Sequence, residues 1–146
     1  MRVFDCFPFF NELELLEFRF QTLYEHVDYF VIAEANRTHT GKDKDFIFDK
    51  NKDRFSEFMD KVIHVKIDDL PIYREEMVKA SGVDDWAPEN YQRNCLARGL
   101  NNQNLTAEDR IIVSDLDEIP NPQTVKENLC HKQWVTLRQK LYYYYI

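Results

Sequence analysis

The sequence contains few cysteines, and their spacing excludes two common structural roles. Cys6, Cys95 and Cys130 are far apart, and no two of them form a CxxC pair. Structural zinc sites usually draw on such pairs, and disulfide frameworks usually use an even number of cysteines at close spacings. We therefore expect neither a zinc site nor a disulfide framework, but buried thiols in a reducing compartment.

The sequence also lacks a basic stripe of the kind that nucleic-acid-binding proteins carry. Its 19 lysines and arginines are outnumbered by 26 acidic residues, and the net charge is -7. We therefore predict no nucleic-acid partner. An acidic protein that binds an anionic ligand needs local cations or a metal ion to do so.

Long apolar runs are absent as well. No stretch approaches the roughly 18 apolar residues of a membrane-spanning helix. No signal peptide precedes Arg2, where a strand pattern already begins. The N-x-[ST] sequons at Asn36 and Asn104 carry little weight without a secretory signal. From these observations we expect a soluble, cytoplasmic protein with no membrane span.

What the sequence does contain is sufficient for one globular domain over residues 1–146. Hydrophobic residues make up 44% of the chain and aromatic residues 14%, which argues against disorder. Strand and helix patterns alternate, which predicts an α/β domain around a largely parallel sheet. The predicted strands are 2–7, 29–33, 62–67, 111–113, 134–138 and 141–146, and the predicted helices are 11–26, 50–60, 88–100 and 121–129.

Local signals support these assignments. Pro8 is expected to end the first strand, and Asn11 with Glu14 forms a capping pattern at the start of the first helix. The apolar face of that helix repeats at spacings of three and four. Its members are Leu13, Leu16, Phe20, Leu23 and Val27. In the second helix we expect three residues to point inward: Phe55, Phe58 and Met59.

An acidic string follows the apolar run at residues 111–113, which we predict to be a buried strand. Asp115 and Asp117 are one residue apart, and Glu118 comes next. Carboxylates crowded at a strand exit repel one another, and a bound Mg²⁺ or Mn²⁺ would remove that repulsion. The alternative is an ordinary polar turn, in which acidic residues are common, and this string alone does not decide between the two.

Other polar residues are expected near the same edge of the sheet. In parallel α/β sheets, ligands bind beyond the carboxyl ends of the strands, where the strand order reverses. Asp5 and Glu34 lie near the ends of the first two predicted strands. If the first strand pairs with strand 111–113, their ends share one crevice. Arg93, with Asn94 beside it, precedes that strand and supplies donors suited to phosphate. A solvated helical arginine or a structural ion pair is the alternative for Arg93.

The chain stops within a tyrosine-rich strand pattern over residues 142–146. An exposed apolar strand would form an aggregation-prone edge. We therefore expect the domain to be truncated at its C-terminus or completed by a partner.

Several blocks of this sequence resemble glycosyltransferase family 17, and the similarity extends over nearly the whole chain in the same order. Because several separate blocks match the same family, their combined resemblance is more specific than the match of any single block. The blocks are residues 3–14 (VFDCFPFFNELE), 27–32 (VDYFVI), 38–42 (THTGK), 63–65 (IHV) with 68–71 (DDLP), 92–94 (QRN) and 114–120 (SDLDEIP).

The resemblance implies a GT-A-like, Rossmann-like nucleotide-sugar-binding domain, of which this chain would be the donor-binding part. It implies an inverting enzyme that moves GlcNAc from UDP-GlcNAc to a mannose-containing, N-glycan-type acceptor. Asp115 and Asp117 would form its DxD motif and bind Mn²⁺ or Mg²⁺. The residues expected to contact the nucleotide sugar are Asp5, Glu34, Arg93, Asn94, Asp115, Asp117 and Glu118.

Some roles stay open at this point. His39 either contacts the donor or orders its loop, and the ordering role is favoured; His64 is expected to be structural. No residue is identified as the general base. Eukaryotic family members are held in the Golgi membrane by an N-terminal anchor, so a Golgi location is expected only if this protein follows them.

Two other functions compete with transfer. Haloacid-dehalogenase-like phosphatases also place a DxD motif after an apolar strand, but they need a downstream lysine and acidic pair. The 29 residues after Asp117 are too few for those motifs. A nucleotide-sugar-binding remnant without turnover is the other alternative, and the abrupt C-terminus favours it.

Overall fold

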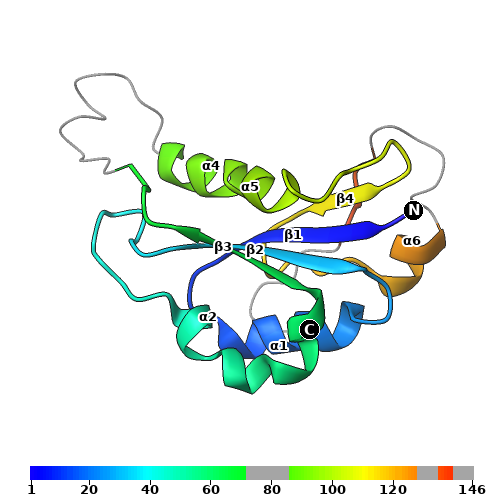
Figure 1. Ribbon diagram of the computed structural model, residues 1–146, viewed down its shortest axis with the longest axis horizontal. Helices are drawn as coiled ribbons and strands as arrows, with labels where there is room; N and C mark the ends of the chain where they lie inside the picture. The colour runs from blue at the N-terminus through cyan, green and yellow to red at the C-terminus, as the bar shows by residue number, and fades with distance from the viewer. Residues whose placement is uncertain (72–85, 128–134, 140–146) are drawn as a thin grey trace.

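The computed structural model describes residues 1–71, 86–127 and 135–139 (Figure 1). Within these residues one sheet of four parallel strands forms the centre of the molecule. The strands are β1 (Val3–Phe9), β2 (Tyr29–Ala35), β3 (Val62–Ile67) and β4 (Arg110–Val113). This confirms the predicted α/β class with a parallel sheet and all four of its predicted strands up to residue 113.

The strand order is β3-β2-β1-β4, so the direction of winding reverses at β1. The chain first moves outward from β1 to β2 and β3, and then crosses back to place β4 on the other side of β1. The register pairs Cys6 with Val113, which confirms that the first strand adjoins the strand before the acidic string. The reversal leaves a crevice beyond the carboxyl ends of β1 and β4, where such folds bind ligands.

Helices cover both faces of the sheet (Figure 1). On one face lie α1 (Leu13–Leu23), α2 (Ile47–Lys50) and the 3-10 helix η1 (Lys52–Lys61). On the other face lie α4 (Ala87–Asn94) and α5 (Leu96–Leu100), and the short helix α6 (Pro122–Glu127) follows the acidic string. Each covered face of the sheet buries its own apolar cluster.

The apolar face predicted for the first helix is confirmed. Leu16, Phe20 and Leu23 are fully buried, and the Phe20 ring packs against those of Phe30 and Phe55. The predicted capping pattern is wrong, because the residue preceding the helix is Glu12 and it makes no side-chain cap. Glu14 instead pairs with an arginine of η1 at the surface.

The prediction that Pro8 ends the first strand is wrong, because β1 continues to Phe9. The last residue of β4, Val113, pairs with Cys6, so Pro8 lies past the end of β4. At Pro8, β1 is therefore paired only with β2. A strand tolerates a proline where one side of its backbone needs no donor.

Two predicted helices are divided in the structure. Residues 47–61 form α2 and η1 in place of one helix, with Phe55 and Phe58 buried as expected and Met59 partly buried. Residues 87–100 form α4 and α5, which are separated at Cys95. Capping by Asn121 is confirmed, because its Oδ1 accepts a hydrogen bond of 2.9 Å from the Gln123 amide in α6.

The predicted strand at 134–138 is wrong for its described part, because residues 135–139 have no strand structure. A strand needs a hydrogen-bonding partner, and in the described part of the chain none is paired with these residues. Trp134, the strand predicted at 141–146 and Cys130 lie outside the described residues. The other two cysteines, Cys6 and Cys95, are free and buried, as expected.

Strand β4 is only partly buried, which differs from the prediction of a buried strand. Ile112 is 7% exposed, whereas Ile111 and Val113 are 45% and 53% exposed. β4 is the edge strand of the described sheet, and α4 and α5 lie over β1, β2 and β3 rather than over β4.

Candidate functional site

A cavity of about 820 Å³ opens at the carboxyl ends of β1, β2 and β4. Its size is in the range of small-molecule sites. The floor is apolar and includes Phe9, Phe10 and Leu116. The acidic residues in the lining are Glu12, Glu89, Asp115 and Asp117, and the basic ones are Arg37, His39, Lys42 and Lys44.

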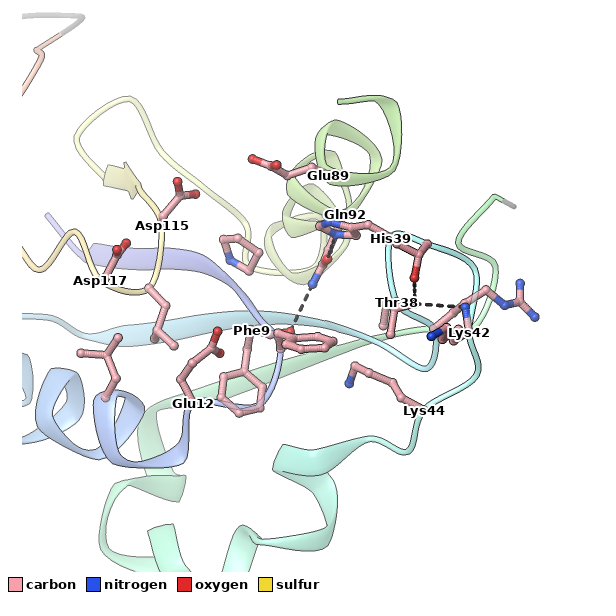
Figure 2. A pocket seen from close by; sticks show the side chains of 17 residues that line it. Phe9, Glu12, Thr38, His39, Lys42, Lys44, Glu89, Gln92, Asp115 and Asp117 are labelled. Atoms are coloured by element: carbon pink, nitrogen blue, oxygen red, sulfur yellow. Dashed lines mark hydrogen bonds between the residues drawn. The ribbon is translucent and has the colours of Figure 1, made fainter. Parts of the chain in front are cut away.

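Figure 2 shows how these charges are arranged. Asp115, Asp117 and Glu12 lie on one side of the cavity, and Lys42 and Lys44 lie on the opposite side. The two aspartates belong to the loop of residues 114–118 that follows β4, which we call the acidic loop. The cavity is therefore polarised, and a ligand that spans it would meet carboxylates at one end and ammonium groups at the other.

The basic side comes from the loop after β2, which we call the basic loop (residues 36–45). A tight turn shapes its tip, where the Gly41 amide donates to the Thr38 carbonyl at 2.9 Å. Gly41 has a φ of 84°, a conformation that glycine adopts without steric cost. The turn places Lys42 at the cavity, while Lys44 also lies over the Phe10 ring at 5.4 Å.

Arg93 reaches the acidic loop and forms ion pairs. Its Nη2 donates to Oδ1 of Asp115 at 2.6 Å and to Oε1 of Glu89 at 3.1 Å. The hydrogen bond to Asp115 is the main reason that the pKa of Arg93 is raised. Asn94, the next residue, is exposed and does not line the cavity.

Asp5 lies in the core and not at the cavity. It is fully buried, and its two carboxylate oxygens accept hydrogen bonds of 2.8 and 2.7 Å from Nε and Nη2 of Arg19. The physical reason is the length of β1, which continues to Phe9 and leaves Asp5 in mid-strand. Its side chain faces α1, on which Arg19 lies.

Glu34 is also buried away from the cavity. Its Oε1 accepts from the Phe48 amide at 3.0 Å, and its Oε2 lies 2.9 Å from Nε2 of His64. These contacts hold α2 and β3 to the end of β2, and they agree with the structural role expected for His64. Neither Asp5 nor Glu34 is placed to touch a ligand in the cavity.

Glu118 acts within the acidic loop. Its Oε2 accepts a hydrogen bond of 3.0 Å from the Asp115 amide, and its own amide donates to the Asp115 carbonyl at 3.1 Å. These reciprocal bonds close the turn around Leu116 and Asp117. Glu118 does not line the cavity.

Gln92 contacts the cavity and was not among the residues that we predicted to bind. It is 5% exposed, and its amide nitrogen donates to the carbonyls of Phe9 and Ala33 at 3.2 and 2.9 Å. Because both amide hydrogens point to carbonyls, Oε1 must face Nε2 of His39, 2.8 Å away. Nε2 therefore carries the hydrogen, and Gln92 fixes the orientation of the His39 ring.

Comparison with known proteins assigns this sequence to a family. The family model of glycosyltransferase family 17 matches residues 1–146. The chain belongs to glycosyltransferase family 17. This confirms the resemblance of the sequence blocks, of which two, 92–94 and 114–120, meet at the acidic loop through the contact of Arg93 with Asp115.

The family 17 chain is similar to curated relatives named beta-1,4-mannosyl-glycoprotein 4-beta-N-acetylglucosaminyltransferase. The rat and human proteins are each 31% identical to it over 123 residues, and the mouse protein is 30% identical. The aligned region is 82% of this chain but 22% of each relative, so the chain spans about a fifth of their length. No solved structure matches it significantly.

The ligands that this family 17 chain offers to a divalent cation are carboxylates. Across the described ranges, no cluster of three or more histidine, cysteine or acidic side chains is arranged to hold a metal ion. Mg²⁺ is commonly bound by one or two carboxylates together with substrate phosphates and water. Asp115 and Asp117, which both line the open cavity, fit that kind of shared site.

None of the helices in the described residues combines the length and apolar character that crossing a bilayer requires.

Proposed function

We propose that this protein is the donor-binding part of an inverting, metal-dependent glycosyltransferase that transfers GlcNAc from UDP-GlcNAc to a mannose-containing, N-glycan-type acceptor. One observation carries the proposal. Two carboxylates of the acidic loop and two lysines of the basic loop line one cavity at the point where the strand order reverses. The names of the relatives supply the sugar and the acceptor class.

The charge pattern suits a nucleoside diphosphate. Asp115 and Asp117 would hold a Mn²⁺ or Mg²⁺ ion, which would supply positive charge to the diphosphate as the bond to the sugar breaks. Lys42 and Lys44 are placed to bind phosphate oxygens from the other side of the cavity. Stabilisation of the leaving diphosphate accelerates transfer because its charge is largest in the transition state.

Arg93 keeps the acidic loop from repelling the donor before the ion binds. Its guanidinium neutralises part of the charge on Asp115 through the 2.6 Å hydrogen bond. Arginine also presents several donors in a fixed plane that matches phosphate oxygens. Arg93 can therefore bind Asp115 in the free protein and share that carboxylate with a cation once a donor is present.

The apolar floor suits the remaining parts of the donor. Phe10 lines the cavity and is 43% exposed, which leaves part of its ring open to a planar base or to the apolar face of a sugar. Inversion at the sugar carbon then needs one base that takes the proton of the acceptor hydroxyl as it attacks opposite the leaving diphosphate.

A transfer assay tests the proposal. The protein from its complete reading frame is incubated with Mn²⁺, an N-glycan acceptor with exposed mannose, and UDP-GlcNAc, UDP-galactose or UDP-glucose in parallel. Mass spectrometry and proton NMR identify the product and its anomeric configuration. We expect a β-linked GlcNAc product from UDP-GlcNAc that disappears when the metal is chelated and in Asp115→Ala/Asp117→Ala.

Four outcomes would contradict the proposal in different ways. An α-linked product would refute inversion, and full activity with chelator would refute metal dependence. Hydrolysis of phosphate monoesters with no use of nucleotide sugars would instead identify a DxD phosphatase. Tight binding of UDP-GlcNAc without transfer to any mannose acceptor would favour the binding remnant.

A further inference from the structure

Arg19 is a charged residue on the apolar face of α1, and its side chain is fully buried. It was not predicted as a site residue, although its position between Leu16 and Leu23 on the helical stripe is unusual for an arginine. Its charge is balanced by Asp5, which accepts two hydrogen bonds from it. The guanidinium also lies 4.4 Å from the centre of the Phe7 ring.

The remaining donors of Arg19 hold the backbone of the acidic loop. Nη1 donates to the carbonyls of Asp115 at 2.7 Å and Leu116 at 3.0 Å, and lies 3.4 Å from that of Glu118. Nη2 donates to the hydroxyl of Ser114 at 2.7 Å, and this hydroxyl donates to the Glu118 carbonyl at 3.1 Å. One buried side chain therefore contacts four of the five residues in the loop.

These contacts decide which way the loop side chains point. Arg19 contacts the carbonyls of Asp115 and Leu116, and leaves the Asp115 carboxylate to the cavity. Leu116 is 7% exposed and packs into the core cluster beneath the loop. With residue 116 anchored inward, Asp115 and Asp117 on either side of it both line the cavity (Figure 2).

We propose that Arg19 is a positioning residue that holds the acidic loop in the one conformation that presents Asp115 and Asp117 together to a divalent cation and a nucleotide diphosphate. The ligand named here rests on the proposed function, whereas the ordering of the loop does not. A buried ion pair is seldom a net source of stability. The Asp5–Arg19 pair is better explained as the neutral anchor from which the loop is held.

The planar fork of arginine is essential to this role. It carries five donor hydrogens in a fixed geometry, whereas a lysine ammonium has three on a flexible stem. Arg19→Lys keeps a positive charge beside Asp5 but cannot reach Ser114 and the two loop carbonyls at the same time. Arg54→Lys is the matched control, because Arg54 pairs with Glu14 and Glu17 at the surface, away from the acidic loop.

Two measurements on the full chain test the proposal. Backbone ¹⁵N heteronuclear NOE values report the order of residues 114–118 without any ligand. Calorimetric titration with UDP in the presence of Mn²⁺ reports how tightly the protein binds the nucleotide diphosphate. We expect Arg19→Lys to lower the NOE values over 114–118 and to weaken UDP binding at least tenfold, while Arg54→Lys changes neither.

Rigid loop amides and UDP affinity within twofold of the wild type in Arg19→Lys would overturn the proposal. If Arg19→Lys does not fold, Ser114→Ala replaces it, because that change leaves the Asp5–Arg19 pair intact. Ser114→Ala should weaken UDP binding at least threefold, and unchanged binding would refute the proposal. If the wild type itself binds no UDP, the proposed function fails, and the NOE values alone decide the role of Arg19.

Discussion

Gly99 of α5 packs closely against the sheet, and Gly99→Ala tests this packing. A Cβ atom at this position would lie 2.6 Å from Cγ1 of Val31, 2.9 Å from Cγ2 of Val65 and 3.2 Å from Cγ2 of Ile63. Carbon atoms in a packed core are usually about 3.5–4.0 Å apart. The helix or the valines must therefore move.

Two opposing effects set the magnitude of this change. Alanine is the better helix former by about 1 kcal/mol, whereas overpacking a core usually costs about 1–3 kcal/mol. The two shortest contacts are to valines on neighbouring strands, β2 and β3, so a small rotation of the helix cannot relieve both. We expect the clash to dominate and Gly99→Ala to lose about 1–2 kcal/mol.

Urea unfolding followed by circular dichroism measures this loss. Ala97→Gly, at an exposed position of the same helix, is the matched control and should lose about 1 kcal/mol through helix propensity alone. The double variant Gly99→Ala/Val31→Ala should lose less unfolding free energy than the two single variants together, by more than about 0.5 kcal/mol. A Gly99→Ala protein at least as stable as the wild type would refute this account of the packing.

Three further predictions concern the core, acid stability and the cavity. Phe20→Ala should reduce the free energy of unfolding by about 3–5 kcal/mol in urea, because a fully buried ring is removed; a loss below about 1 kcal/mol would contradict this. Hydrogen bonds from Arg98, and then from Tyr91, lower the pKa of Asp69 from 3.8 to about 2. The resulting stability is present above pH 3.8 and is lost as the pH falls through 2. Asp69→Asn should therefore be less stable than the wild type at pH 7, and the difference should vanish below pH 2; a constant difference would count against the ion pair. Gln92→Glu replaces a donor with an acceptor opposite two strand carbonyls and should cost at least about 2 kcal/mol at pH 7; wild-type stability would show that these hydrogen bonds are absent in solution.

The fold could be predicted largely from hydrophobic patterning. Short segments rich in apolar residues identified β1 to β4, and alternation with helices indicated parallel pairing. Element ends were harder to place, because they depend on neighbours. Pro8 is accommodated in β1 only because β4 has already ended at Val113.

The candidate site was predicted in part. Arg93 contacts Asp115, and Asp115 and Asp117 both line the cavity, because the winding of the sheet places β4 beside β1. Asp5 and Glu34 were expected at the same edge, but both are buried. Asp5 binds Arg19, and Glu34 binds the Phe48 amide and His64. Proximity to a strand end gives the position of a residue along the sheet, and does not show whether its side chain faces a ligand or a helix.

Arg19 and Gln92 could not be assigned roles from sequence. Arg19 contacts loop residues 95 to 99 positions away, and Gln92 contacts the Phe9 carbonyl 83 positions away. Such contacts exist only once the sheet has formed. An arginine on an apolar helical stripe was the one available signal, and it indicates a buried polar partner without naming it.

The central claim is that the acidic loop binds a divalent cation and a nucleotide diphosphate together. Calorimetric titration of the protein with UDP-GlcNAc, with and without Mn²⁺, tests it most directly. We expect binding only with Mn²⁺, and no binding in Asp115→Ala/Asp117→Ala. Equal affinity without the metal, or in the double variant, would contradict the claim.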